Sequence, residues 1–252
     1  MRRTIKADVL RTQRKKSLII TSVITIVLIL TAGIIAGLGL IKGDHSIQFR
    51  SFVGAATTFT PFLIGIPVFN SVFSDDFKSH SMQISIGRGF SRNKIIYARF
   101  IETLILIAEA FLFFSLFIVG LALIFSIKNG CMIGALKDLW KLYPYLICYI
   151  AVSMIFVYLT QAGTLGLVVF ILLSASVTDM IITALKLVPF LSEERLGHNI
   201  GNITIDGMLG CMFSSAREDW KRALYGIAAL VIYIIVPIIV SKKIFKHKEL
   251  EF

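Results

Sequence analysis

Charged side chains are scarce in this sequence, and the common signatures of catalysis are missing from it. Asp, Glu, Lys and Arg supply 16% of the 252 residues, against about 25% in an average soluble domain. Neither GxxxxGKS nor GxxxxGKT occurs, so this chain cannot cradle nucleotide phosphates in a P-loop. HExxH is also missing, and the four histidines are scattered. The three cysteines show no spacing with histidine that would hold a metal.

Long apolar runs take the place of these signatures. Residues 17–41 carry no charge over more than the ~20 residues needed to cross hydrocarbon, and the run is too long and too late for a secretory signal. The apolar stretch from Tyr143 to Phe190 is interrupted by TQAGTLG (160–166), so we expect two antiparallel spans there. The sequence predicts an all-α polytopic membrane protein, one transmembrane domain over 1–252. Its six helices are expected at 17–41, 52–73, 100–127, 143–160, 165–190 and 223–241, with Pro61 and Pro67 kinking the second.

Lysine and arginine placement predicts the orientation. Residues 1–16, 74–99 and 242–252 hold seven, five and four of the 26 basic residues. Loops rich in Lys and Arg stay on the cytoplasmic side, so both termini are expected there, in a protein of the cell membrane. The net charge of +11 is then explained by anionic membrane lipids. No basic folded surface is left over for nucleic acid.

Acidic residues and glycines inside the spans are candidate functional positions. Charged groups within a membrane are rare and often line a transport path, so Glu102, Glu109 and Asp179 are candidates for a translocation path. Near the end of its span, Glu102 is expected to be solvated, whereas Glu109 fits a polar path or an interhelix hydrogen bond. Asp179 is expected to pair with a neighbouring helix or face an exterior vestibule. Gly33 and Gly37 form GxxxG, which permits close helix packing in the bundle or between subunits.

A polar segment at residues 74–99 lies between the second and third spans. Ser74 is a suitable N-cap, Asp75 and Asp76 would favour a helix N-terminus, and Gly87 would close the helix. We expect a helix of about 12 residues, roughly 18 Å long, and a second helix capped by Ser91. Its apolar contacts are expected from Phe77, Met82, Ile84 and Ile86. The helix either lies on lipid or docks a soluble partner.

This arrangement resembles the permease subunits of ABC transporters, in the six-span type-2 exporter class. In that class, the loop between spans two and three reads as an acidic residue, small residues, an apolar pair, P-x-S-R and a basic residue entering span three. Asp75 and Asp76 stand at the acidic position, Ser91-Arg92 at the S-R and Ala98-Arg99 at the basic entry. The chain departs from the pattern in having Asp for Glu and GRGFSR without the proline.

The resemblance implies several structural features. The loop would contain a coupling helix that docks on a cytoplasmic ATPase, which would bind ATP and Mg while this chain binds no cofactor. Residues 1–16 would form an elbow helix along the membrane, and residues 191–222 would hold short helices in the outer leaflet. The implied ATPase-coupling residues are Asp75, Asp76, Phe77, Met82, Ile84, Ile86, Arg88, Ser91 and Arg92.

The resemblance also implies a function. It predicts a non-catalytic bacterial export subunit that works as a homodimer or heterodimer and moves an antimicrobial peptide, another amphipathic antibiotic or a lipid-like cargo. The alternatives are a membrane-embedded protease or lipid-modifying enzyme, and a non-transporting scaffold. Cys131 and Cys211 both fall in segments expected outside, so a disulfide between them is left open.

Overall fold

The computed structural model describes most of the chain, and all secondary structure in this part is helical, as the sequence predicts. The first expected span, 17–41, lies mostly outside the described part, and Gly33 and Gly37 lie wholly outside it. The described residues are 9–16, 18–20, 23–24, 27, 31, 45–75, 82, 86–87, 89–124, 126–177, 180–181, 204–214 and 220–247.

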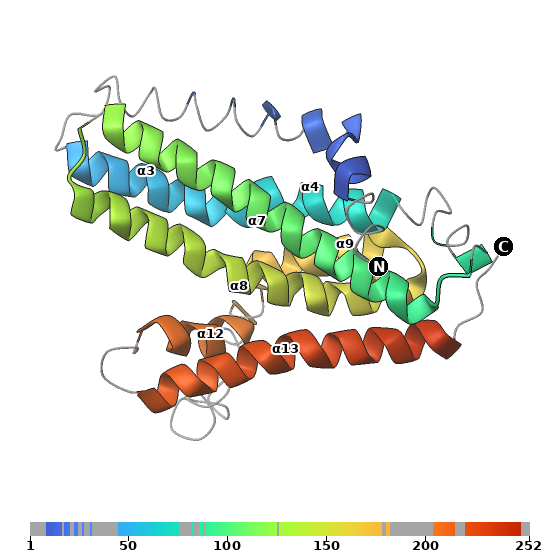
Figure 1. Ribbon diagram of the computed structural model, residues 1–252. Helices are drawn as coiled ribbons and strands as arrows, with labels where there is room; N and C mark the ends of the chain where they lie inside the picture. The colour runs from blue at the N-terminus through green and yellow to red at the C-terminus, as the bar shows by residue number, and fades with distance from the viewer. Residues whose placement is uncertain are drawn as a thin grey trace. The chain divides into compact units, whose positions relative to one another are not determined.

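The described helices are shown in Figure 1. They are α3 (His45–Thr60), η1 (Pro61–Gly65), α4 (Ile66–Phe69), η2 (Asn70–Ser74), α7 (Arg92–Ile124), α8 (Asn129–Thr160), α9 (Gly163–Ser174), α12 (Ile205–Ser214) and α13 (Trp220–His247). Within the described residues, four stretches are long and apolar enough to cross a membrane: Phe49–Ser74, Arg92–Ile124, Asn129–Thr160 and Leu224–Lys246. They overlap the second, third, fourth and sixth expected spans. The fifth, 165–190, is described only in part, beginning with the apolar α9 of 12 residues.

Helices α7 and α8 extend well beyond the apolar runs. They have 33 and 32 residues, or about 50 Å each, whereas the hydrocarbon layer is about 30 Å thick. α7 begins at Arg92 rather than at 100, and α8 begins at Asn129 rather than at 143. The early part of α8 carries an exposed Lys141–Asp138 ion pair of 2.8 Å, a spacing that supports helix in water. The length of the apolar run therefore underestimates the length of each of these helices.

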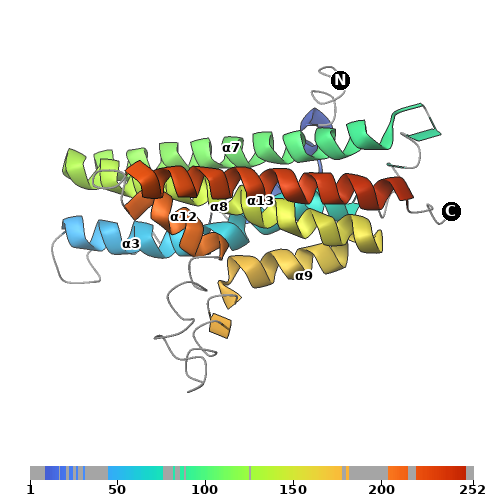
Figure 2. The same cartoon turned by 90° about the horizontal axis from the view of Figure 1, so that it is seen from below.

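The predicted break within TQAGTLG is present. α8 ends at Thr160 and α9 begins at Gly163. Gln161 between them has a φ of 56°, in the left-handed region that stops a helix. In Figure 2, α9 turns back beneath the end of α8.

The chain forms two compact units, and α7 and α8 contribute to both. The first unit contains Met1–Asp76 and Ala98–Tyr143. Within it, an aromatic group joins α7 to α8, since the ring of Phe111 lies 5.9 Å from that of Trp140 and 5.7 Å from that of Tyr143. Trp140 Nε1 also donates to Ser115 Oγ at 3.0 Å, so the indole is satisfied while its body packs.

The helix before residue 76 contains two widened turns. In η1 and η2, backbone N–H groups donate five residues back, as from Asp75 to the carbonyl of Asn70. Pro61 and Pro67 have no N–H to donate and so interrupt the usual ladder. Pro61 is the first residue of η1, whereas Pro67 lies in α4, the α-helical turn between η1 and η2. The two prolines expected to kink this span are therefore found in or next to π-helical turns, which are frequent at functional sites.

The second unit contains Phe77–Tyr97 and Pro144–Phe252. Within it, α12 packs along α13, and the hydroxyl of Tyr149 on α8 bonds to the carboxylate of Asp206 on α12. α12 falls inside 191–222, where the resemblance implies short helices.

Large apolar side chains remain exposed along the outer faces of single helices. On α7, the side chains of Phe113, Leu116, Leu123 and Ile124 are all more than two-thirds exposed. An uncovered apolar surface of this kind is unfavourable in water but is suited to lipid. Together with the four long apolar stretches, it supports a multi-pass membrane protein.

Candidate functional site

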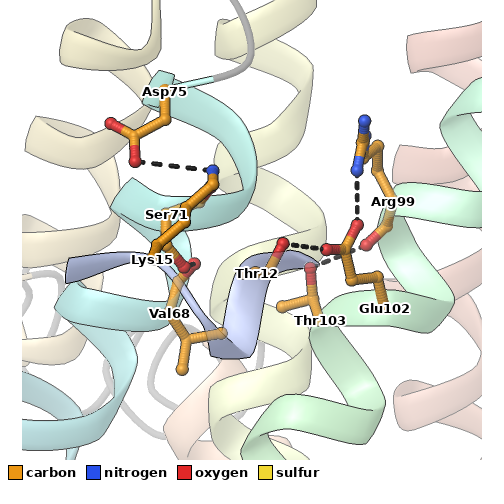
Figure 3. A network of polar contacts seen from close by, with 8 residues as sticks. All are labelled: Thr12, Lys15, Val68, Ser71, Asp75, Arg99, Glu102 and Thr103. Atoms are coloured by element: carbon orange, nitrogen blue, oxygen red, sulfur yellow. Dashed lines mark hydrogen bonds and ion pairs between the residues drawn. The ribbon is translucent and has the colours of Figure 1, made fainter. Parts of the chain in front are cut away.

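The N-terminal helical segment, residues 9–16, is held in the first unit by polar side chains. Thr12, Gln13 and Lys15 each bond to a different position on the helices before and after the 76–91 connection. Figure 3 shows Thr12 directed toward Glu102 on α7 and Lys15 directed toward the end of η2. We call this set of contacts the N-terminal clamp.

Glu102 is the centre of the clamp on α7. Its Oε2 accepts from Arg99 Nη1 at 2.6 Å, and its Oε1 accepts from Thr12 Oγ1 at 2.5 Å. The side chains of Arg99 and Glu102 are only 5% and 1% exposed. A buried carboxylate is tolerated when it is both ion-paired and hydrogen-bonded. The expectation that Glu102 is solvated is therefore wrong, because the chain itself supplies the partners that water would have given.

Lys15 contacts η2, which lies shortly before the 76–91 connection. Its Nζ donates to the backbone carbonyl of Ser71 and lies 3.5 Å from Asp75 Oδ2. Lys15 thus fastens residues 9–16 to η2 through one backbone carbonyl and one carboxylate.

Two local expectations for this junction are wrong. Ser74 is not an N-cap, because it is the last residue of η2 and the residue after it, Asp75, remains in right-handed helical geometry. The carboxylate of Asp75 faces the ammonium of Lys15 instead of a helix N-terminus. The helix of the second span therefore runs through the position where a new helix was expected to start.

Gln13 makes the third contact of the clamp. Its Nε2 donates to Glu109 Oε2 at 2.6 Å. This matches the interpretation of Glu109 as a hydrogen-bonding group between helices, and its place in a cargo path stays a prediction.

Glu109→Gln is expected to leave the thermal stability of the purified chain near that of wild type. The new amide oxygen can still accept from Gln13, so the contact survives without the charge. The measurement is the monodisperse fraction on size-exclusion chromatography after heating to a series of temperatures. A clear loss of the monodisperse fraction at temperatures that the wild-type chain withstands would show that the negative charge at 109 is itself required.

The coupling segment is described only in places. Asp76, Phe77, Ile84 and Arg88 lie outside the described residues, as does Asp179 of the proposed path. Met82 is 2% exposed, so its side chain is buried, and its role in docking stays a prediction. Ile86 is half-buried and Phe90 is 39% exposed.

The end of the coupling segment also differs in detail from the expectation. Gly87 is helical, whereas Gly89 has a φ of 87° and its N–H donates to the carbonyl of Ile86. Gly89, rather than Gly87, therefore makes the left-handed turn. Ser91 directly precedes α7, and its carbonyl accepts from the N–H of Lys94, which places it at the expected cap position.

Sequence reasoning missed the N-terminal half of the clamp. The resemblance assigns Arg99 only to the basic entry of the third span, although its spacing of three from Glu102 allows an ion pair on one helix face. Thr12, Gln13 and Lys15 gave no separate signal inside a basic segment. The side chain of Cys211 is not described, so its pairing with Cys131 stays open.

The polar contacts of the N-terminal clamp hold residues 12–15 against η2 and α7. Within the described residues, the buried carboxylate of Glu102 has both oxygens engaged and none directed at open solvent. Comparisons with models of protein families, with curated proteins and with solved structures give no match for this chain.

Proposed function

We propose that this chain is the membrane-spanning permease subunit of an ATP-driven ABC transporter of the type-2 exporter class. It has no nucleotide-binding motif of its own, so ATP and Mg would be bound by a separate cytoplasmic ATPase. Two permease subunits would form the path for an amphipathic peptide, an antibiotic or a lipid-like cargo. The chain itself would be non-catalytic.

The observation that carries the proposal is the N-terminal clamp. The resemblance implies an elbow helix at residues 1–16, next to the membrane. Here residues 12–15 bond both to the end of η2 and to α7, the helices before and after 76–91. A basic tail that merely lay on lipid would need none of these contacts.

The proposal includes six spans, with both termini and the 76–91 connection in the cytoplasm. His80→Cys, in a background without the three native cysteines, is expected to resist a membrane-impermeant thiol reagent in intact cells. The same protein should be labelled after the membrane is opened, because the connection carries the positive charge that keeps loops inside. Labelling in intact cells would contradict this topology.

The function is tested by co-expressing the tagged chain with each ABC ATPase encoded by the host. One ATPase is expected to co-purify in a fixed ratio and to show vanadate-sensitive hydrolysis in proteoliposomes that depends on the permease. Deletion of the permease should raise sensitivity to the exported compound. If no ATPase binds and the deletion changes the distribution of no amphipathic compound, the transporter proposal fails.

A further inference from the structure

At the C-terminal end of the 76–91 connection, the side chain of Arg92 bonds to the end of α13. The first residues of α7 and the last turn of α13 both belong to the second unit. Arg92 Nη1 donates to the carbonyl of Phe245 at 2.9 Å and to that of Lys246 at 3.4 Å. These are terminal carbonyls of α13, which ends at His247 and so leaves its last four without helical partners. Arg92 is a side-chain cap on α13.

Aromatic contacts strengthen the same junction. The guanidinium carbon of Arg92 lies 5.6 Å from the ring centroid of Phe245, within the range of a cation–π interaction. The ring of Phe245 is fully buried and lies 5.0 Å from that of Tyr158 near the end of α8. Lys242 Nζ repeats the arrangement, donating to Tyr97 OH at 2.8 Å and lying 4.7 Å from the Tyr97 ring centroid.

The placement of Arg92 is informative because it opposes local helix electrostatics. A cation in the first turn of α7 is unfavourable for the dipole of α7, while the same charge is favourable at the C-terminal end of α13. The neighbouring Lys94 is exposed on the same helix. The carbonyls of α13 therefore stabilise the positive charge of Arg92, whereas solvent or lipid headgroups stabilise that of Lys94.

We propose that Arg92 is a positioning residue that ties the end of α13 to the start of α7, so that displacement of the 76–91 connection is passed to the sixth span. The second half of this inference rests on the proposed transport function, while the tie itself does not. Arg92 would then act on α13 of its own chain, in place of serving as a surface charge for the ATPase.

The tie is tested with a buried reporter on α13. Ser241 is fully buried, its hydroxyl has no hydrogen-bond partner within the described residues, and it lies four residues before Phe245 on the same helix face. Ser241→Cys, in a background without the three native cysteines, therefore adds a thiol at little cost in packing. Its reaction rate with a small thiol reagent measures how often the end of α13 opens.

Arg92→Gln is expected to raise that rate about tenfold, because charge-assisted hydrogen bonds are stronger than neutral ones. Arg92→Lys, which replaces the planar guanidinium with a single ammonium, should give an intermediate rate. The matched control is Lys94→Gln, which removes the same charge two residues away and should leave the rate unchanged. Equal rates for Arg92→Gln and Lys94→Gln overturn the tie. If Arg92→Gln is recovered too poorly to measure, Arg92→Lys against Lys94→Gln decides in the same way.

A second measurement separates the tie from the transport function. In proteoliposomes with the ATPase found by co-expression, Arg92→Gln should lower transport per ATP hydrolysed while the ATPase still co-purifies in the wild-type ratio. If transport per ATP is unchanged while the labelling rate rises as expected, Arg92 ties α13 to α7 but does not pass displacement of the connection to α13. Failure of the wild-type chain to bind any ATPase would instead refute the proposed function.

Discussion

Arg99→Ala is expected to destabilise the folded chain by about 3–5 kcal/mol, the cost of leaving a buried charge without its partner. The variant keeps the carboxylate of Glu102 in a site that is almost closed to solvent, with the hydroxyl of Thr12 as the donor left from the clamp. The purified variant should lose its monodisperse peak at a much lower temperature than wild type, and its yield in membranes should fall.

Two comparisons make this result specific to the buried pair. Lys141→Ala breaks an ion pair of similar length whose side chains are 43% and 52% exposed, and exposed pairs contribute only about 0–1 kcal/mol. The triple variant Thr12→Val, Arg99→Met and Glu102→Met removes the whole polar set and should recover much of the stability, because apolar groups can replace a buried pair. Equal losses for Arg99→Ala and Lys141→Ala would show that the pair contributes no more than a surface contact.

If the chain is the permease proposed above, Phe90→Asp is expected to weaken binding of its ATPase while leaving the chain folded. Met82→Asp is expected instead to lower the amount of folded chain in the membrane. Phe90 is a large apolar side chain, 39% exposed, in the 76–91 connection. Loss of an anchor at an interface hot spot commonly costs above about 2 kcal/mol, or roughly a 30-fold weaker association. Met82 is 2% exposed, so a carboxylate there would be buried without a partner.

Both variants are measured by membrane yield and by the ratio of co-purified ATPase to permease. The control is Phe90→Leu, which keeps an apolar side chain and should retain most of the ATPase. If Phe90→Asp binds the ATPase at the wild-type ratio, Phe90 is not a docking anchor. If Met82→Asp inserts normally but loses the ATPase, the side chain of Met82 is presented to the partner after all.

The sequence predicts the helical class and the approximate positions of the four long apolar stretches, because both depend on apolar composition averaged over many residues. It also predicts the break before α9, since TQAGTLG is a local interruption in a long run. It does not predict where α7 and α8 begin, because helix geometry continues through residues such as Asp138 and Lys141 that a hydrophobicity pattern assigns to a loop.

The clamp is harder to predict, for a different reason. Glu102 and Arg99 are close in sequence, and their spacing is a usable signal. Thr12 and Gln13 meet α7 across separations of 90 and 96 residues, and nothing in the character of either side chain selects that partner. Met82 shows the same limit, since an apolar residue in a polar segment is equally consistent with docking and with burial in its own chain.

The long separation between Thr12 and Glu102 implies an order of assembly during biosynthesis. At about 5–20 residues per second, the 90 residues between them take roughly 5–20 s to synthesise, and Thr12 has no clamp partner during this interval. Arg99 and Glu102 are three residues apart, so they can pair within one turn as α7 forms, and a paired carboxylate enters the bilayer at lower cost than a lone one. Local neutralisation would thus come first, and the N-terminal helix would close over an ion pair that is already in place.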